Sequence, residues 1–251
     1  MPEHILSLSY GKDSIACLGA IEQLGWPLDR IIHAEIWATD TIPADLPPMI
    51  EFKIRADRII KERWGIEVEH IRHKMTYEQM FYRPITRGPK KGITKGWPLC
   101  SNTRAWCRNL KMRDKLSPKN AISYVGIGAD APARFHNLSD IKCSPLLRGG
   151  GGPEEDCRKW CEENNLLSPI YTTASRGGCW FCHYQGVDQL RLLRRNYPEL
   201  WTLMLKWDND SPVTFKSNGH TVHDFDKRFE MEDDGLIMPY DKSFRWKILD
   251  N

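Results

Sequence analysis

Near its start the chain reads Ser7-Leu8-Ser9-Tyr10-Gly11-Lys12-Asp13-Ser14, a small polar stretch between the apolar pair Ile5–Leu6 and a helix-like run that begins at Ile15. This order predicts a strand, a tight turn and the start of a helix. The first N–H groups of a helix lack partners and carry a partial positive charge. The stretch therefore predicts an anion site at its turn.

The residue types in this turn suit a phosphate. Gly11 lets backbone N–H groups approach an anion closely, and Lys12 adds a mobile cation. Ser7, Ser9 and Ser14 add hydroxyl donors. We expect a cradle for a pyrophosphate, and the alternative is a strand-to-helix turn that needs small residues for steric reasons alone. The stretch does not follow the Walker A pattern G-x-x-x-x-G-K-[ST].

Length and composition limit the class of protein. A chain of 251 residues with 41% apolar residues suits one large α/β domain, or one domain with a small appendage. The net charge is only +3, and no apolar run is as long as a membrane span. Without a visible export signal, the protein is expected in the cytoplasm. Its eight cysteines should then be metal ligands, reactive thiols or core residues rather than disulfides.

Strand and helix patterns alternate along the chain. Such an alternation predicts an α/β fold whose parallel sheet has helices on both faces, with ligands at the carboxyl ends of the strands. We expect a nucleotide-binding α/β domain over 1–148, and a Cys-containing helical extension with a tail, including a short β segment, over 149–251. Strands are expected at 5–9, 31–37, 66–71 and 121–127, and helices at 12–24, 49–64, 103–116, 154–164 and 186–206.

Two acidic positions adjoin this predicted edge. Asp13 begins the first helix, where a carboxylate caps the helix by default or, beside a bound triphosphate, orients Mg²⁺. Asp40 and Thr41 follow the second strand, where an Asp commonly forms a turn.

A Gly-rich segment follows the fourth strand. Gly126 and Gly128 free the backbone there, while Asp130 adds a carboxylate and Arg134 adds a bidentate anion-binding group. Arg134 is predicted to clamp an anion, and the alternative is a surface salt bridge.

The middle of the chain is strongly basic. Residues 81–119 contain eleven basic residues and one acidic residue, Asp114, for a net charge of +10. Such a block favours a polyanion, either nucleotide phosphates or a nucleic-acid backbone, over a merely solvated loop and helix face. The cations are Arg83, Arg87, Lys90, Lys91, Lys95, Arg104, Arg108, Lys111, Arg113, Lys115 and Lys119.

The cysteines allow two metal sites. Cys179-Trp180-Phe181-Cys182 is a tight C-x-x-C segment after two glycines, whose backbone N–H groups are suited to stabilise thiolates. With Cys157 and Cys161 it has the spacing of a structural zinc ribbon. With Cys100 and Cys107 it suits a [4Fe–4S] cluster. Cys17 and Cys143 stand apart and are expected in the core.

The Ser9–Ser14 stretch closely resembles the S-G-G-K-D-S loop of the PP-loop ATP pyrophosphatases and of the related PAPS (sulfonucleotide) reductases, with Tyr10 in place of the first Gly. The resemblance spans roughly residues 5 to 185. It implies the adenine nucleotide alpha hydrolase-like, Rossmann-like variant of the fold, with ATP or a related adenine nucleotide held over residues 7–14. Asp40-Thr41 resembles the D-T-G segment of the reductases, which places them at the ribose or adenine.

Two further segments are similar to reductase motifs. The segment 126–134 resembles G-x-R-x-x-[QE]-S-x-x-R, with Gly128 at the first Arg, and this similarity places Gly126, Gly128, Asp130 and Arg134 over the nucleotide. Trp106-Cys107 and Gly178-Cys179 resemble the two segments that hold the reductase cluster. This similarity favours [4Fe–4S] on Cys100, Cys107, Cys179 and Cys182 over zinc.

The resemblance implies a transferase-type enzyme that splits ATP into AMP and pyrophosphate to adenylate an acceptor, with Lys12, Asp13 and Arg134 as catalytic residues. Cluster-dependent sulfur transfer to nucleic acid would follow, with the basic segment 83–119 binding the acceptor and a partner protein donating sulfur. No Cys follows Cys182, so the tail lacks the thiol nucleophile of the reductases. The alternatives are a reductase that uses an external thiol, and a zinc-stapled nucleic-acid-binding module with a degenerate nucleotide site.

Overall fold

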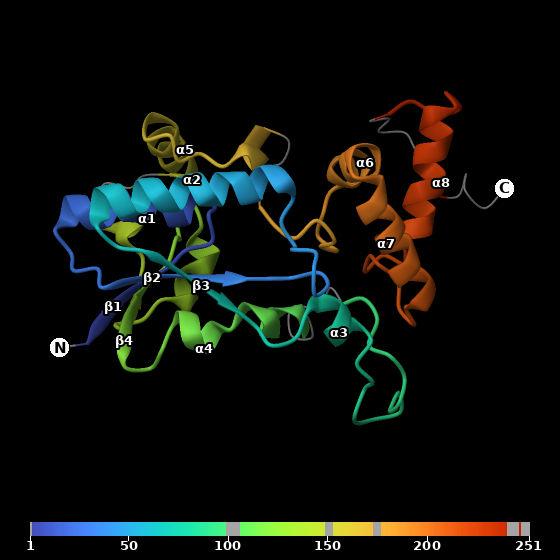
Figure 1. Ribbon diagram of the computed structural model, residues 1–251, viewed down its shortest axis with the longest axis horizontal. Helices are drawn as coiled ribbons and strands as arrows, with labels where there is room; N and C mark the ends of the chain where they lie inside the picture. The colour runs from blue at the N-terminus through green and yellow to red at the C-terminus, as the bar shows by residue number, and fades with distance from the viewer. Residues whose placement is uncertain (1, 99–105, 149–152, 173–176, 240–245, 247–251) are drawn as a thin grey trace. The chain divides into compact units, whose positions relative to one another are not determined.

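A parallel sheet organises the first part of the molecule (Figure 1). The computed structural model describes residues 2–98, 106–148, 153–172, 177–239 and 246. Within these residues five strands pair in the order β3-β2-β1-β4-β5, and all of the pairs are parallel. This confirms the predicted α/β class. The strands are β1 (Glu3–Ser7), β2 (Arg30–Glu35), β3 (Val68–Arg72), β4 (Ala121–Tyr124) and the unpredicted two-residue β5 (Lys142–Cys143).

The central strand is β1. Its Leu6 pairs with Ile31 of β2 on one side and with Tyr124 of β4 on the other. After β3 the chain crosses β1 and builds β4 on the opposite side. In such sheets the carboxyl ends of the two strands at the reversal form the usual place for a ligand.

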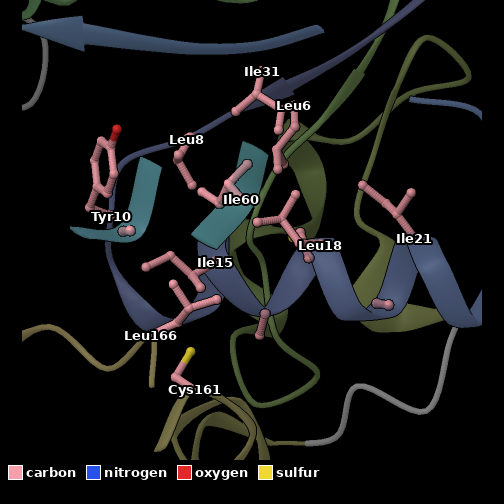
Figure 2. Packing of buried hydrophobic residues seen from close by; sticks show 14 of the residues in the cluster. Leu6, Leu8, Tyr10, Ile15, Leu18, Ile21, Ile31, Ile60, Cys161 and Leu166 are labelled. Carbon is pink, nitrogen blue, oxygen red and sulfur yellow. The ribbon is translucent and has the colours of Figure 1, made fainter. Parts of the chain in front are cut away.

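Helices cover both faces of the sheet, as predicted (Figure 1). Successive residues of a strand point to opposite faces. Leu6 therefore packs under the helices α1, α2 and α5, whereas Ile5 packs with Leu116 of α4. Figure 2 shows Leu6, Leu8 and Ile31 meeting residues of α1 and α2 in the larger core. The helices are α1 (Lys12–Leu24), α2 (Pro47–Trp64), α4 (Arg113–Leu116) and α5 (Glu154–Glu163).

Two helix ends are local and match the prediction. Gly25 and Gly65 follow α1 and α2 with φ of 62° and 70°, the left-handed conformation that terminates a helix readily at glycine. The start of α2 lies two residues before the predicted Met49, at Pro47, because the first turn of a helix tolerates proline.

The chain forms two compact units, each discontinuous in sequence. Unit 1 comprises Met1–Lys74 and Asn109–Gly177, and unit 2 comprises Met75–Arg108 and Gly178–Asn251. Unit 2 thus begins as an insertion in the crossover from β3 to β4. The segment after residue 148 is shared between the units, whereas the predicted domains were separated by a single boundary there.

Unit 2 has an aromatic core. Trp180 and Trp207 stack with centroids 5.7 Å apart, and Phe81 meets Trp97 edge-on at 5.3 Å. Its helices are α3 (Tyr77–Phe81), α6 (Val187–Asn196), α7 (Pro198–Asp210) and α8 (Val222–Asp233). Short 3-10 helices complete the described elements. One, Trp106–Lys111, begins in unit 2 and ends in unit 1; the others lie in unit 1, at Pro132–Asn137, Pro145–Leu147 and Pro169–Thr172.

Two helix predictions and one strand prediction need correction. The single helix over 186–206 is two helices, because Pro198 starts α7 and Tyr197 takes a non-helical conformation. The described part of 103–116 is a 3-10 helix and α4, separated by Met112 in the left-handed conformation (φ 42°). Within the described part of 208–251 the structure has α8, capped by Thr221, where we expected a β segment.

No helix in the described part of the chain is both long and apolar enough to cross a membrane.

Candidate functional site

The β1–α1 loop (residues 8–11) is closed by its own serines. The amide nitrogen and the hydroxyl oxygen of Ser9 lie 3.1 and 3.0 Å from Ser14 Oγ. The Ser14 hydroxyl donates to the carbonyl of Gly11 at 2.9 Å. Leu8 extends the strand ladder by donating to Ile32 O at 2.9 Å. The buried Ser14 hydroxyl therefore holds the shape of the loop, and Ser7 is the last residue of β1.

Backbone N–H groups at the start of α1 remain available. Among the described residues, the amides of Gly11, Asp13 and Ser14 have no hydrogen-bond acceptor. The amide of Lys12 donates to the Tyr171 hydroxyl at 3.0 Å. This end of the helix carries a partial positive charge and three N–H donors without an acceptor among the described residues.

Lys12 lies beside these donors with its side chain buried. Its Nζ is 3.1 Å from Asp13 Oδ1, pairs with Glu154 of α5, and lies 5.3 Å from the centre of the Tyr171 ring. Burial works against its charge, but hydrogen bonds to Glu154 and Asp13 prevail and raise the pKa of Lys12. The structure thus holds a permanent cation at the loop, with a carboxylate from α5 as its partner.

Tyr10 departs from the PP-loop pattern without filling the loop. Its φ of 55° is the left-handed conformation that a glycine adopts freely. The ring is buried, its hydroxyl donates to Asp57 of α2, and it lies 3.2 Å from His70 Nε2. The side chain leaves the loop and anchors it to α2 and β3, so the backbone keeps the shape that a glycine would allow.

A second anchor holds the carbonyl of Leu8. His33 Nδ1 lies 2.9 Å from Leu8 O, and Lys53 Nζ lies 2.7 Å from His33 Nε2 and 2.5 Å from Asp45. Burial, followed by the charge of Lys53, lowers the pKa of His33 to about 4. A neutral His33 therefore donates through Nδ1 to Leu8 and accepts from Lys53 through Nε2.

His70 bridges two carboxylates beside the first anchor. Its Nε2 is 2.9 Å from Asp57 and its Nδ1 is 2.8 Å from Glu35. The hydrogen bond with Asp57 is the main cause that raises the pKa of His70, although partial burial opposes it. Sequence reasoning missed this network. The signal was the polar alternation at the ends of β2 and β3, combined with Lys53 and Asp57 one turn apart on α2.

The segment after β4 packs directly on the loop. A Cβ added to Gly126 would lie 2.7 Å from the backbone of Asp13 and of Ser14. Only glycine permits this approach. It brings the predicted segment 126–134 into contact with the predicted phosphate-binding stretch 7–14. Gly128, two residues further along the chain, is buried.

Asp130 and Arg134 take different positions. Asp130 accepts the amide of Glu154 at 3.0 Å and so caps α5. Arg134 is exposed on the 3-10 helix that follows, and among the described residues its guanidinium has no ion-pair partner. Arg134 is thus an exposed cation that could contact an anion, whereas the carboxylate of Asp130 is already bound to the start of α5.

Asp40 and Thr41 lie in a tight turn after β2. The turn is closed by Ala38, which donates to Ile42 O at 2.8 Å, and by Ile42, which donates to the Thr39 hydroxyl at 3.0 Å. Both predicted residues are exposed at the carboxyl edge of the sheet, the edge that also carries the β1–α1 loop.

The cysteines of unit 1 belong to its core. Cys17 and Cys161 are fully buried, and Cys161 donates through Sγ to Lys12 O at 3.4 Å. Burial raises the pKa of Cys157 to about 11 and that of Cys161 to about 12, so both thiols stay protonated. Cys143 packs against the same core.

The C-x-x-C segment of unit 2 forms the thiol turn (residues 179–182). Cys182 donates to Cys179 O at 3.0 Å, and the Gln185 side chain donates to the same carbonyl at 3.0 Å. Lys216 donates to His183 O at 2.7 Å and to Gln185 O at 2.5 Å. Both cysteines are half-buried.

Three of the predicted cluster ligands affect one buried tyrosine hydroxyl. Burial, followed by the proximity of Cys107, Cys182 and Cys179, raises the pKa of Tyr77. However, no three His, Cys, Asp or Glu side chains among the described residues are arranged to hold a metal, and Cys100 lies outside those residues. The described thiols do not form a complete coordination site, and the [4Fe–4S] site stays a prediction.

Comparison with known proteins gives no match, either to a family model or to a curated protein.

Proposed function

We propose that this protein is an ATP-dependent enzyme of the PP-loop type, related to the PAPS reductases and built on the adenine nucleotide alpha hydrolase-like fold. It would convert ATP into AMP and pyrophosphate and adenylate an acceptor. One observation carries the proposal. Open N–H groups and a buried cation meet at the point where the sheet order reverses, and Gly126 packs against them from β4.

The phosphates would bind at the start of α1. The amides of Gly11, Asp13 and Ser14 supply donors, and the helix adds its partial charge. Lys12 would exchange Glu154 for a phosphate oxygen. The observed ion pair supports the proposal, because the exposed carboxylate of Glu154 occupies the position beside Lys12 that a phosphate oxygen would take.

The remaining predicted residues complete the nucleotide site. Asp40 and Thr41 would face the ribose or adenine from the end of β2, and Arg134 would close over the phosphates. Asp13 would orient the Mg²⁺ ion that accompanies ATP. Asp130 supports the site indirectly, since it caps the helix that carries Glu154.

The reaction is a substitution at phosphorus. An acceptor oxygen forms a bond to the α-phosphorus, the bond to the bridging oxygen breaks, and pyrophosphate leaves with the electron pair. With water as the acceptor the products are AMP and pyrophosphate. The protein contributes positioning and charge neutralisation, through Lys12, Arg134 and the open amides, rather than a covalent intermediate.

Sulfur transfer is the second part of the proposal. The setting of the cysteines favours the set that includes Cys107 over the zinc set, because Cys157 and Cys161 serve the core of unit 1. A cluster on Cys100, Cys107, Cys179 and Cys182 would present sulfide from a donor protein. The described thiols alone do not complete a site for this group.

Pyrophosphate release from ATP tests the proposal. The purified protein should release pyrophosphate and AMP in equal amounts, and Lys12→Ala should lower the rate at least tenfold, since a phosphate-facing cation is lost. Lys61→Ala removes an exposed lysine of α2 and is the matched control, with no expected effect. Thermal melts verify that both variants fold.

Two results would contradict the proposed reaction: no pyrophosphate from the wild-type protein, or an unchanged rate in Lys12→Ala. Binding of PAPS in strong preference to ATP would instead support the reductase alternative.

A further inference from the structure

The long connection after α3 is a hairpin rather than an irregular loop. Its two arms pair through Lys95, which donates to Arg83 O at 3.1 Å, and through Ile85, which donates to Ile93 O at 2.8 Å. Pro84 and Thr94 form an antiparallel bridge between them. Figure 1 shows the chain leaving α3 and returning through this element, which we call the basic hairpin (residues 82–96).

The charge of the basic hairpin is uncompensated. It carries five cations and no acidic residue. None of the five has an ion-pair partner among the described residues, and four of them are exposed. Partial burial, together with the charge of Arg83, lowers the pKa of Lys95. The cations are Arg83, Arg87, Lys90, Lys91 and Lys95.

The base of the hairpin is firmly held. Trp97 is buried, and it donates through Nε1 to Asp208 at 2.8 Å and through its amide to Ser211 at 3.1 Å. Tyr82 donates to Asp210 at 2.5 Å. These bonds fix both arms to the end of α7, so the cations are presented on an anchored element rather than on a free loop.

The same aromatic core supports the thiol turn. Trp207 stacks on Trp180 of that turn at 5.7 Å, and it also meets Phe81 at 6.0 Å and Trp97 at 6.1 Å. Unit 2 therefore joins an anchored basic arm and a pair of thiols through one core.

We propose that the basic hairpin binds the phosphate backbone of a nucleic acid. A nucleic acid presents phosphates at regular, close spacing, which suits several exposed cations on one hairpin that have no ion-pair partner among the described residues. Tyr82 is tied to Asp210, so contact with the backbone is favoured over stacking on bases. The proposal deepens the proposed function by naming the partner, but the binding itself requires no ATP.

An acidic protein is the weaker match for this surface. Protein interfaces normally have an apolar centre. Ile93, at 44% exposure, is the one large exposed apolar side chain of the hairpin. The hairpin offers charge without an apolar centre, which is the character of surfaces that contact nucleic acid.

Salt-dependent binding tests the proposal. Full-length protein is titrated, without ATP, into a fluorescent 20-base-pair DNA and a 20-nucleotide RNA of mixed sequence at several salt concentrations. We expect binding that weakens linearly on a log–log plot of affinity against salt. Replacing Arg87, Lys90 and Lys91 by Gln should lower the affinity at least tenfold. Because each lost phosphate contact reduces the slope by about 0.7–0.9, the triple variant should reduce it by about 2–3.

A second triple variant controls for net charge. This variant also removes three positive charges, but from α2 and α5 in unit 1, through Lys61→Gln, Arg158→Gln and Lys159→Gln. It should keep the wild-type affinity and slope. An equal loss in both triple variants would overturn the proposal, and so would an absence of binding to either nucleic acid. Tighter binding of an acidic peptide than of nucleic acid would also overturn it, in favour of a protein partner.

Pyrophosphate release separates this proposal from the proposed function. The hairpin variant should keep the wild-type rate with water as acceptor. Nucleic-acid binding without any pyrophosphate release would support the hairpin while contradicting the proposed reaction.

Discussion

The β1–α1 loop of unit 1 and the thiol turn of unit 2 differ in how tightly the chain packs around the glycines beside them. On one side of the loop the packing is tight: Gly126 touches the backbone of α1, and Lys12 and Ser14 are buried. Before the turn, a Cβ on Gly177 or Gly178 would meet none of the described residues within 4 Å. The chain is therefore tightly packed at the glycine beside the loop, whereas it is open at the glycines before the turn.

The cysteines repeat this contrast. Cys17, Cys157 and Cys161 of unit 1 are buried, and their raised pKa values keep them as thiols. Those of the turn are half-buried beside Tyr77. A packed loop is formed before its ligand arrives, which suits binding by preorganised donors. A turn with accessible thiols suits ligation or sulfur chemistry.

The largest expected effect concerns the packed glycine. Gly126→Ala places a methyl group against the backbone of α1, which cannot move cheaply. We expect a loss of about 1–3 kcal/mol in the free energy of unfolding, and a fall in pyrophosphate release larger than that of Lys12→Ala. Urea denaturation and the pyrophosphate assay measure the two effects.

Gly178→Ala is the matched control in unit 2. Its Cβ would meet no neighbour within 4 Å in the described part of the chain, so the free energy of unfolding should change by less than about 0.5 kcal/mol. Similar losses in both variants would remove the contrast between a packed loop and an open turn.

A smaller effect separates the two groups of thiols. Cys161→Ala removes a fully buried sulfur and its bond to Lys12, and should cost about 1 kcal/mol in the free energy of unfolding without changing metal content. Cys179→Ser should do the reverse, lowering the iron bound after anaerobic purification with little effect on the stability of the metal-free protein. Metal analysis and urea denaturation provide both readouts. Metal loss in Cys161→Ala would contradict the separation of core cysteines from cluster ligands. Absence of iron from the wild-type protein would contradict the predicted cluster itself.

The smallest expected effect is on the pH dependence of the anchor beside Tyr10. Because the pKa of His70 is raised in the folded protein, its contacts with Asp57 and Glu35 stabilise fully below the ordinary His value of about 6.5. That contribution is lost as the pH rises through the higher folded pKa. His70→Gln should therefore lower the free energy of unfolding more at pH 5.5 than at pH 9. A difference independent of pH would show that the imidazolium charge does not contribute.

Local signals predicted much of unit 1. The glycines after α1 and α2 take left-handed conformations that few other residues adopt easily, so both helix ends were readable. Pro198 was an equally local signal, but the single helix expected over 186–206 continued across it. Leu190 and Trp201 are buried in two different helices.

Other features carry no local signal. Lys53 reaches His33 across twenty residues, and Tyr10 reaches His70 across sixty. Nothing near Tyr10 shows that its ring would leave the loop. The contact between Gly126 and Asp13 joins segments more than a hundred residues apart, and it exists only because β4 pairs with β1.

Chain periodicity and a few punctuating residues were enough to assign the α/β class, the loop before the first helix and the core character of Cys17, because these depend on neighbours along the chain. The order of the strands, the insertion of a second unit after β3, the anchoring of Tyr10 and the pairing of Lys12 with Glu154 became apparent only in three dimensions. Each of these depends on residues distant in sequence, whose meeting is set by packing of the sheet and its helices rather than by any local preference.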